Sequence, residues 1–236
     1  MNRSLSPSRR RFITLAGVGF AWHAVRTGFA AANSTAIPSA NIENAAEALQ
    51  ALTAGNQRYV TGANLHHDFG PERPGLVAGQ RPFAVILSCS DSRVAPELAF
   101  DQSRGRLFVI RVAGNFVDDS GLASVEYGTS VLGASLVMVL GHTECGALKA
   151  AVDVVTRGTK LPGHLPKLVA HLEPAVREAR GEGSGLVEAA IRQNVRLNVR
   201  KLQNSEPVLA ELVKTNRVLV VGAIYDLLTG RVIAVT

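Results

Sequence analysis

Several features typical of other protein classes are missing from this sequence. It has no internal repeat, and no low-complexity tract beyond its first 32 residues. With 47% hydrophobic and 19% charged residues, it is composed like a globular protein rather than a disordered or fibrous one. A Gly-x-Gly-x-x-Gly phosphate loop is absent, and Gly114-Asn115 after an apolar run is a poor substitute for it. These absences favour a single domain of about 200 residues and argue against nucleotide binding.

Positive charge is scarce outside the N-terminus. The formal net charge is +6, but the first 32 residues contain no acid and no lysine. Their five arginines are Arg3, Arg9, Arg10, Arg11 and Arg26, which leaves a net charge of +1 for the rest of the chain. A nucleic-acid-binding domain gathers basic residues on its folded surface. The distribution of charge therefore predicts no nucleic-acid partner.

The N-terminus has the pattern of an export signal. A twin-arginine pair, Arg9-Arg10, precedes an apolar stretch that runs from Phe12 to about Val25 and is followed by the small residues 30–32. A disordered basic tail would need neither the apolar stretch nor the small residues. The stretch is too short and too weakly apolar to remain as a stable membrane span. We expect residues 1–32 to be a signal peptide for the Tat translocase, cleaved to leave residues 33–236 in a bacterial periplasm.

The rest of the chain predicts an α/β fold. Short runs that are apolar on both faces are typical of strands covered by helices on both sides, and they occur at 83–87, 107–112, 136–140 and 218–224. Apolar spacing predicts a helix from about Ala45 that ends at Gly55, and 61–82 is expected to be loop. Further helices are expected at 121–134, 145–157, 164–180, 185–203 and 205–215, with a final edge strand at 231–235. The prediction is a mostly parallel sheet flanked by helices.

Metal-ligating residue types follow two of these strands. Cys89 and His142 each come just after an apolar run, and ligands gather beyond the carboxyl ends of parallel strands. His142 and Cys145 are spaced so that both can face one metal. Two thiolates and one imidazole with an open fourth position match catalytic zinc. In an exported protein the alternative for the two cysteines, Cys89 and Cys145, is a disulfide.

A carboxylate and a guanidinium stand directly after the first ligand. Asp91 and Arg93 can pair across a tight turn at that spacing. The plainer interpretation is a solvated surface ion pair, which contributes little to stability. Their position beside a metal ligand favours a functional role.

Together these motifs resemble the β-carbonic anhydrases. Cys-x-Asp-x-Arg at 89–93 and His-x-x-Cys at 142–145 are that family's motif pair, and the likeness runs from about Glu43 to Val235. The resemblance implies a sheet of strand order 2-1-3-4 with a C-terminal edge strand, and one Zn²⁺ per subunit. It also implies reversible hydration of CO₂ to bicarbonate and a proton through a zinc-bound hydroxide, with Asp91 and Arg93 as catalytic residues.

The resemblance extends to the substrate pocket. It assigns substrate binding to Gln80, Phe108, Tyr127 and Gly146, although Phe108 and Tyr127 are equally compatible with buried core aromatics. Relatives whose zinc closes under regulation use a tryptophan, whereas Trp22 lies inside the predicted signal. We therefore expect the plant-like (type I) kind, with a site that is always open. His66 and His67 are candidate proton relays, though exposed histidines usually have no such role.

Relatives assemble as homodimers, often paired into homotetramers, with the active site at the subunit interface. In that arrangement Gln80 and Tyr127 would serve the partner's zinc. Alternative functions remain open from the sequence: hydrolysis of carbonyl sulfide or carbon disulfide on the same fold, or a non-catalytic binding protein stabilised by zinc or by a disulfide.

Overall fold

A computed structural model describes residues 42–179 and 185–235 of the chain. The predicted signal peptide and Trp22 lie outside the described residues. No helix within these ranges is both long enough and apolar enough to cross a membrane.

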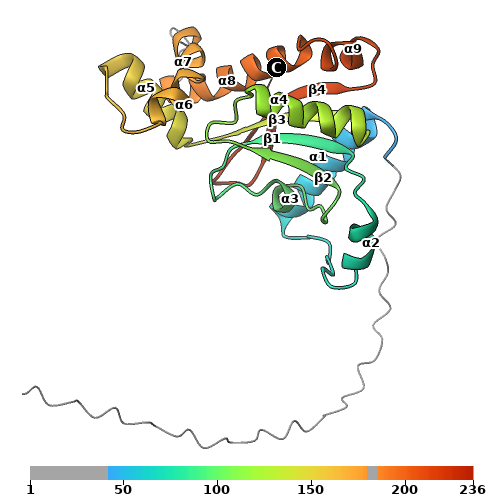
Figure 1. Ribbon diagram of the computed structural model, residues 1–236. Helices are drawn as coiled ribbons and strands as arrows, with labels where there is room; N and C mark the ends of the chain where they lie inside the picture. The colour runs from blue at the N-terminus through green and yellow to red at the C-terminus, as the bar shows by residue number, and fades with distance from the viewer. Residues whose placement is uncertain (1–41, 180–184, 236) are drawn as a thin grey trace, which may run out of the picture. The chain divides into compact units, whose positions relative to one another are not determined.

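A five-stranded sheet forms the centre of the described chain (Figure 1). The strand order is β2-β1-β3-β4-β5, in which the first four strands are parallel and β5 is antiparallel to β4. This is the predicted α/β fold and strand order. The strands are β1 (Ala84–Ser88), β2 (Leu107–Arg111), β3 (Leu136–His142), β4 (Leu219–Tyr225) and β5 (Val232–Val235).

Helices cover both faces of the sheet. They are α1 (Ala45–Thr61), α2 (Arg73–Ala78), α3 (Pro96–Ala99), α4 (Asp119–Glu126), a π-helical turn η1 (Tyr127–Val131), α5 (Gly146–Arg157), α6 (Leu165–Ala170), α7 (Glu173–Glu178), α8 (Leu186–Gln203) and α9 (Leu209–Lys214). The helix predicted at 164–180 is two short helices, and the expected loop at 61–82 contains α2.

The first helix corrects one prediction. It does not end at Gly55 but continues to Thr61, where Gly62 takes the left-handed conformation of a C-cap. Gly55 lies inside the helix, at a position where a Cβ would be 1.8 Å from the carbonyl oxygen of Phe100. The glycine therefore allows α1 to pack closely against the end of α3.

Side-chain alternation along the strands divides the core between the two faces of the sheet. Ala84 and Ile86 of β1 pack with α1 and α3, whereas Val85 and Leu87 pack with α4, α8 and α9. All five residues of β1 and all seven of β3 are buried, which is why their sequences are apolar without alternation. A third cluster joins α5, α7 and α8, and it includes Cys89 and Cys145.

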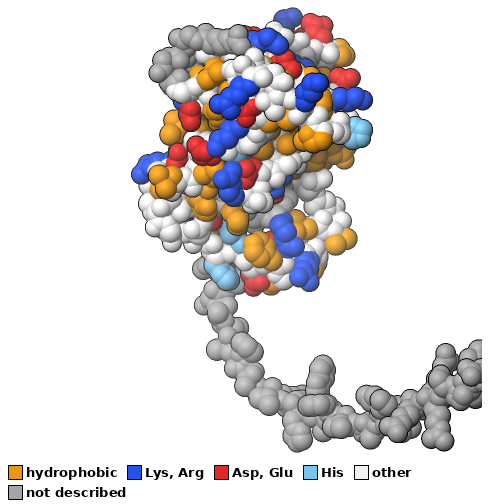
Figure 2. Space-filling model, turned by 90° about the vertical axis from the view of Figure 1, so that its left-hand side faces the viewer, with side chains coloured by type: hydrophobic (Ala, Val, Ile, Leu, Met, Phe, Trp, Pro, Cys, Tyr) orange, Lys and Arg blue, Asp and Glu red, His pale blue; other side chains and the backbone are white. Residues whose placement is uncertain are grey.

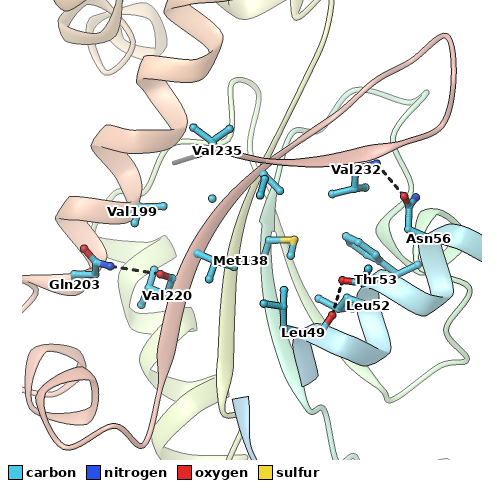
Figure 3. Close-up of a pocket in the computed structure, with 15 residues that line it drawn as sticks. Leu49, Leu52, Thr53, Asn56, Met138, Val199, Gln203, Val220, Val232 and Val235 are labelled. Carbon is cyan, nitrogen blue, oxygen red and sulfur yellow. Dashed lines mark hydrogen bonds between the residues drawn. The ribbon is translucent and has the colours of Figure 1, made fainter. Parts of the chain in front are cut away.

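A cavity of about 550 Å³ opens between α1, α8 and the β4–β5 edge of the sheet. Leu49 and Leu52 of α1 and Val199 of α8 line it from opposite sides (Figure 3). Its lining is mainly apolar and includes none of the residues predicted to bind metal or substrate. On the face shown in Figure 2, basic and acidic side chains are interspersed, with no extended basic patch.

Candidate metal centre

The three predicted metal ligands meet beyond the carboxyl ends of two neighbouring strands. Cys89 follows the last residue of β1, and His142 is the last residue of β3. Because β1 and β3 are parallel and paired with Ser88 opposite Leu140, their ends lie side by side. Cys145 is the N-cap of α5, so the tight turn after β3 returns it to the same place.

The ligand atoms of Cys89, His142 and Cys145 all lie within 4.8 Å of one another, and all three residues are buried. The cysteines are free thiols, so the alternative that a disulfide joins them is wrong. His142 Nδ1 lies 2.8 Å from the Thr143 carbonyl oxygen, to which it donates as the N–H tautomer, and buried Nε2 has no hydrogen-bond partner. An imidazole fixed in this way presents a lone pair at Nε2, as a metal ligand requires.

The two thiols share their protons unequally. A hydrogen bond with Cys145 lowers the pKa of Cys89 to about 4, against the opposing effect of burial. The same interaction, together with burial, raises the pKa of Cys145. The pair therefore holds one thiolate before any metal binds, and a divalent cation would displace the remaining proton. Two sulfurs, one free imidazole nitrogen and a buried position fit Zn²⁺, and they leave one coordination position for water.

Asp91 and Arg93 form a close bidentate pair at the mouth of the site. Arg93 Nε donates to Asp91 Oδ1 at 2.9 Å, Nη2 donates to Oδ2 at 2.7 Å, and the Arg93 backbone N–H also donates to Oδ1 at 3.0 Å. These bonds hold the pKa of the Asp91 carboxyl well below its usual range. Asp91 Oδ2 stays 3.9 Å from His142 Nε2, close to the metal position but outside hydrogen-bond distance.

A further arginine, not identified from the sequence, holds the loop that carries Cys89 and Asp91. Arg111, the last residue of β2, donates to the carbonyl oxygens of Cys89 at 3.0 Å, Asp91 at 2.7 Å and Val94 at 2.8 Å. In the sequence, the sign of this role is an arginine at the end of an otherwise apolar strand. Its partners depend on the register that places Arg111 opposite Ser88.

The predicted substrate residues do not all join this centre. Gly146 is adjacent to Cys145 at the start of α5. Gln80, however, is exposed and lies before β1, whereas Cys89 lies after it, and a strand of five residues spans about 16 Å. The rings of Phe108 and Tyr127 lie together, 6.0 Å apart, with Phe108 paired to Val85 near the amino end of β1. Within one chain, these three residues are separate from the metal ligands.

The two candidate proton relays differ in their surroundings. His67 Nε2 lies 2.9 Å from Asp101 Oδ1, and Asp101 is buried and also bound by Arg58. His67 therefore anchors the loop before α2, whereas His66 is exposed.

Comparison with known proteins points to one family. A family model described as carbonic anhydrase matches residues 84–232. The chain is 38% identical to carbonic anhydrase 2 of Mycobacterium tuberculosis over 191 residues, which make up 80% of this chain and 92% of that protein. It is 36% identical to a carbonic anhydrase of Pseudomonas aeruginosa over 168 residues, 66% of this chain and 74% of that protein. The solved structure of the β-carbonic anhydrase CcaA matches with a TM-score of 0.63 at 30% identity, covering 79% of this chain and 94% of that one.

Proposed function

This chain belongs to the β-carbonic anhydrase family, and from that premise we propose that it hydrates CO₂ reversibly with one Zn²⁺ per subunit, held by Cys89, His142 and Cys145. The observation that carries the metal assignment is the convergence of two free cysteines and an unpartnered imidazole nitrogen in one buried cluster. Zinc bound there would act as a Lewis acid that lowers the pKa of a water molecule toward about 7.

The chain's own residues supply the rest of the chemistry. Arg93 stabilises the Asp91 carboxylate and lowers its pKa, so the ionised carboxylate is available to accept a hydrogen bond from the attacking water. Oδ2 carries one bond from Arg93, which leaves this oxygen able to accept a second. The same bidentate pair keeps Asp91 away from the metal position, so the fourth coordination position stays free for water.

We infer that the site is of the constitutively open, type I kind. The Asp91–Arg93 pair is intact, and Arg111 donates to three backbone carbonyl oxygens of the loop that carries Asp91. The only tryptophan, Trp22, lies within the predicted signal peptide. Outside the pair, Arg93 Nη2 makes only a longer bond, to the Glu144 carbonyl oxygen at 3.4 Å, compared with 2.7 Å to Asp91 Oδ2.

Gln80 and Tyr127 are proposed to complete the site of a partner subunit in a homodimer, which pairs of dimers would extend to a homotetramer. Both are far from their own metal ligands, and both are exposed, Tyr127 by 48%. Val77 of α2, close to Gln80 in the chain, and Val131 of η1, which contains Tyr127, are exposed by 89% and 65%, and a partner would cover such apolar side chains.

Subunit mixing tests this arrangement. We expect Q80A and C89S homodimers to be impaired, while a hybrid of one Q80A and one C89S subunit recovers one complete site, about half of the wild-type activity. If Gln80 served its own subunit's zinc, the hybrid would show no more activity than the Q80A homodimer, and the interface assignment would be wrong.

The wild-type activity is tested with the mature protein, residues 33–236. Zinc content by mass spectrometry and CO₂ hydration by stopped flow are measured on one preparation. Equimolar zinc with fast hydration is expected, and metal-free protein with full activity would overturn the ligand assignment. Hydrolysis of carbonyl sulfide and of carbon disulfide stays a prediction that the same preparation tests.

Export through the Tat translocase to the periplasm is proposed from the twin arginines and the apolar stretch alone. Tat export suits an enzyme that receives its metal before it leaves the cytoplasm.

A further inference from the structure

Two buried asparagines interrupt the apolar face of α8. Asn194 and Asn198 are 1% and 6% exposed and lie one turn apart, so both side chains are on the same face. Buried amides cost free energy unless all their hydrogen bonds are made. The residues one turn before and after them on this face, Ala190 and Leu202, are buried and apolar, so the polar pair calls for an explanation.

The amides bind one loop, residues 112–117, which follows β2. Asn194 Nδ2 donates to the Gly114 carbonyl oxygen at 2.8 Å, and Asn198 Oδ1 accepts from the Val117 N–H at 2.8 Å. Asn198 Nδ2 also donates to Asn194 Oδ1 at 3.2 Å. That bond fixes the orientation of the Asn194 amide, with its nitrogen toward Gly114.

The loop in turn contacts the metal ligand. The Gly114 N–H donates to Cys89 Sγ at 3.3 Å. The Asn115 N–H donates to the Val112 carbonyl oxygen at 2.9 Å, and Gly114 has φ +85°, as the third residue of a type II turn requires. A Cβ on Gly114 would lie 2.8 Å from Leu172 Cδ1, so only glycine brings this N–H to the sulfur.

We propose that Asn194 and Asn198 are positioning residues for the metal ligand Cys89. They hold the 112–117 loop so that the Gly114 N–H stays on the Cys89 sulfur, where it fixes the direction of the sulfur and withdraws charge from the thiolate. The inference rests on the proposed zinc site, and it adds a hydrogen-bonded chain from α8 to one ligand. Loss of a direct hydrogen-bond partner of a metal ligand, here the Gly114 N–H, typically weakens metal affinity by about 10- to 100-fold.

Metal exchange and spectroscopy test the proposal on the mature protein. N194A and N198A are loaded with Co²⁺, and two quantities are measured: the rate of metal loss to a chelator, and the thiolate-to-Co²⁺ charge-transfer absorption. We expect N194A to lose metal about 10-fold or more faster than wild type and to shift the absorption band, with a smaller effect in N198A.

Asn56→Ala is the matched control. Asn56 is a buried asparagine of α1 that donates to the carbonyl oxygens of Ala99 and Gly230 at 2.9 and 2.8 Å, on the other face of the sheet. N56A should lower the stability of the fold but leave the absorption band unchanged, which separates positioning from general destabilisation.

The outcomes distinguish this inference from the proposed function. Suppose that wild type shows the charge-transfer bands and that N194A has the same band and the same rate of metal loss as N56A. The role of the asparagines would then be wrong, whereas the thiolate site would stand. Absence of the bands in wild type would instead overturn the thiolate site itself. Should N194A fail to fold, N198A decides by the same two readouts, because it removes both the bond that orients Asn194 and the acceptor for the Val117 N–H.

Discussion

Replacing Asp91 by asparagine separates the catalytic role of this carboxylate from its structural one. The substitution keeps the size of the side chain and the oxygen that can accept from the Arg93 backbone N–H. It replaces the carboxylate by a neutral amide, whose NH₂ group cannot accept the second bond that Oδ2 takes from Arg93 Nη2 at 2.7 Å.

The structure predicts very different magnitudes for the two roles. The Arg93 side chain is 54% exposed, so solvent screens the pair, and its loss should lower the free energy of unfolding only slightly. Loss of one preorganised hydrogen-bond partner of the reacting group slows a reaction by about 10²- to 10³-fold. That factor corresponds to about 3 to 4 kcal/mol of activation free energy. D91N should therefore be a stable, zinc-containing and slow enzyme.

Stopped-flow CO₂ hydration, zinc content and urea unfolding of D91N test these magnitudes together. The matched control is D153N, because Asp153 forms an Asp–Arg pair with Arg157 on the surface of α5 that touches no ligand. D153N should keep wild-type turnover. Wild-type turnover in zinc-replete D91N would remove Asp91 from the mechanism, and loss of zinc from D91N would show that the carboxylate holds the metal site together instead.

Three other changes have expected outcomes. C89S should lose zinc and activity together, measured by metal analysis and CO₂ hydration, and full metal retention would contradict the ligand assignment. G55A should destabilise the fold by about 1 to 3 kcal/mol in urea unfolding, because its Cβ would lie 1.8 Å from the Phe100 carbonyl oxygen. G75A in α2, where nothing lies within 4 Å, should instead be neutral or stabilising. Lysine in place of Arg9-Arg10 should retain the protein in the cytoplasm in cell fractionation, and unchanged export would indicate another route.

The fold and the ligand cluster could be predicted from the sequence because both depend on local patterns. Apolar runs marked the four parallel strands, and a cysteine and a histidine directly after two of them had to reach one edge of the sheet. The extent of α1 could not be predicted in this way. Gly55 is a helix-ending residue by its local preference, whereas in the fold it is an interior glycine that the close approach of Phe100, distant in sequence, requires.

The residues that support the site were missed for a related reason. Asn194 has the appearance of an ordinary helical polar residue, because its partner Gly114 is 80 positions away in the chain. The role of Arg111 depends on strand register, which no local pattern specifies. Gln80 and Tyr127 could be named only from the family resemblance, since within one chain their positions show no link to the metal ligands.

The order of the strands explains why the site forms where it does. From β1 the chain crosses to β2 on one side and then to β3 on the other, so the connections diverge between β1 and β3, at the switch point where ligands bind in open α/β sheets. Each ligand loop is then held by the next strand outward. Arg111 of β2 binds the loop after β1, and the Tyr225 carbonyl oxygen of β4 accepts from the Thr143 N–H in the loop after β3 at 3.0 Å. The outer strands therefore fix the geometry of a metal centre to which they contribute no ligand.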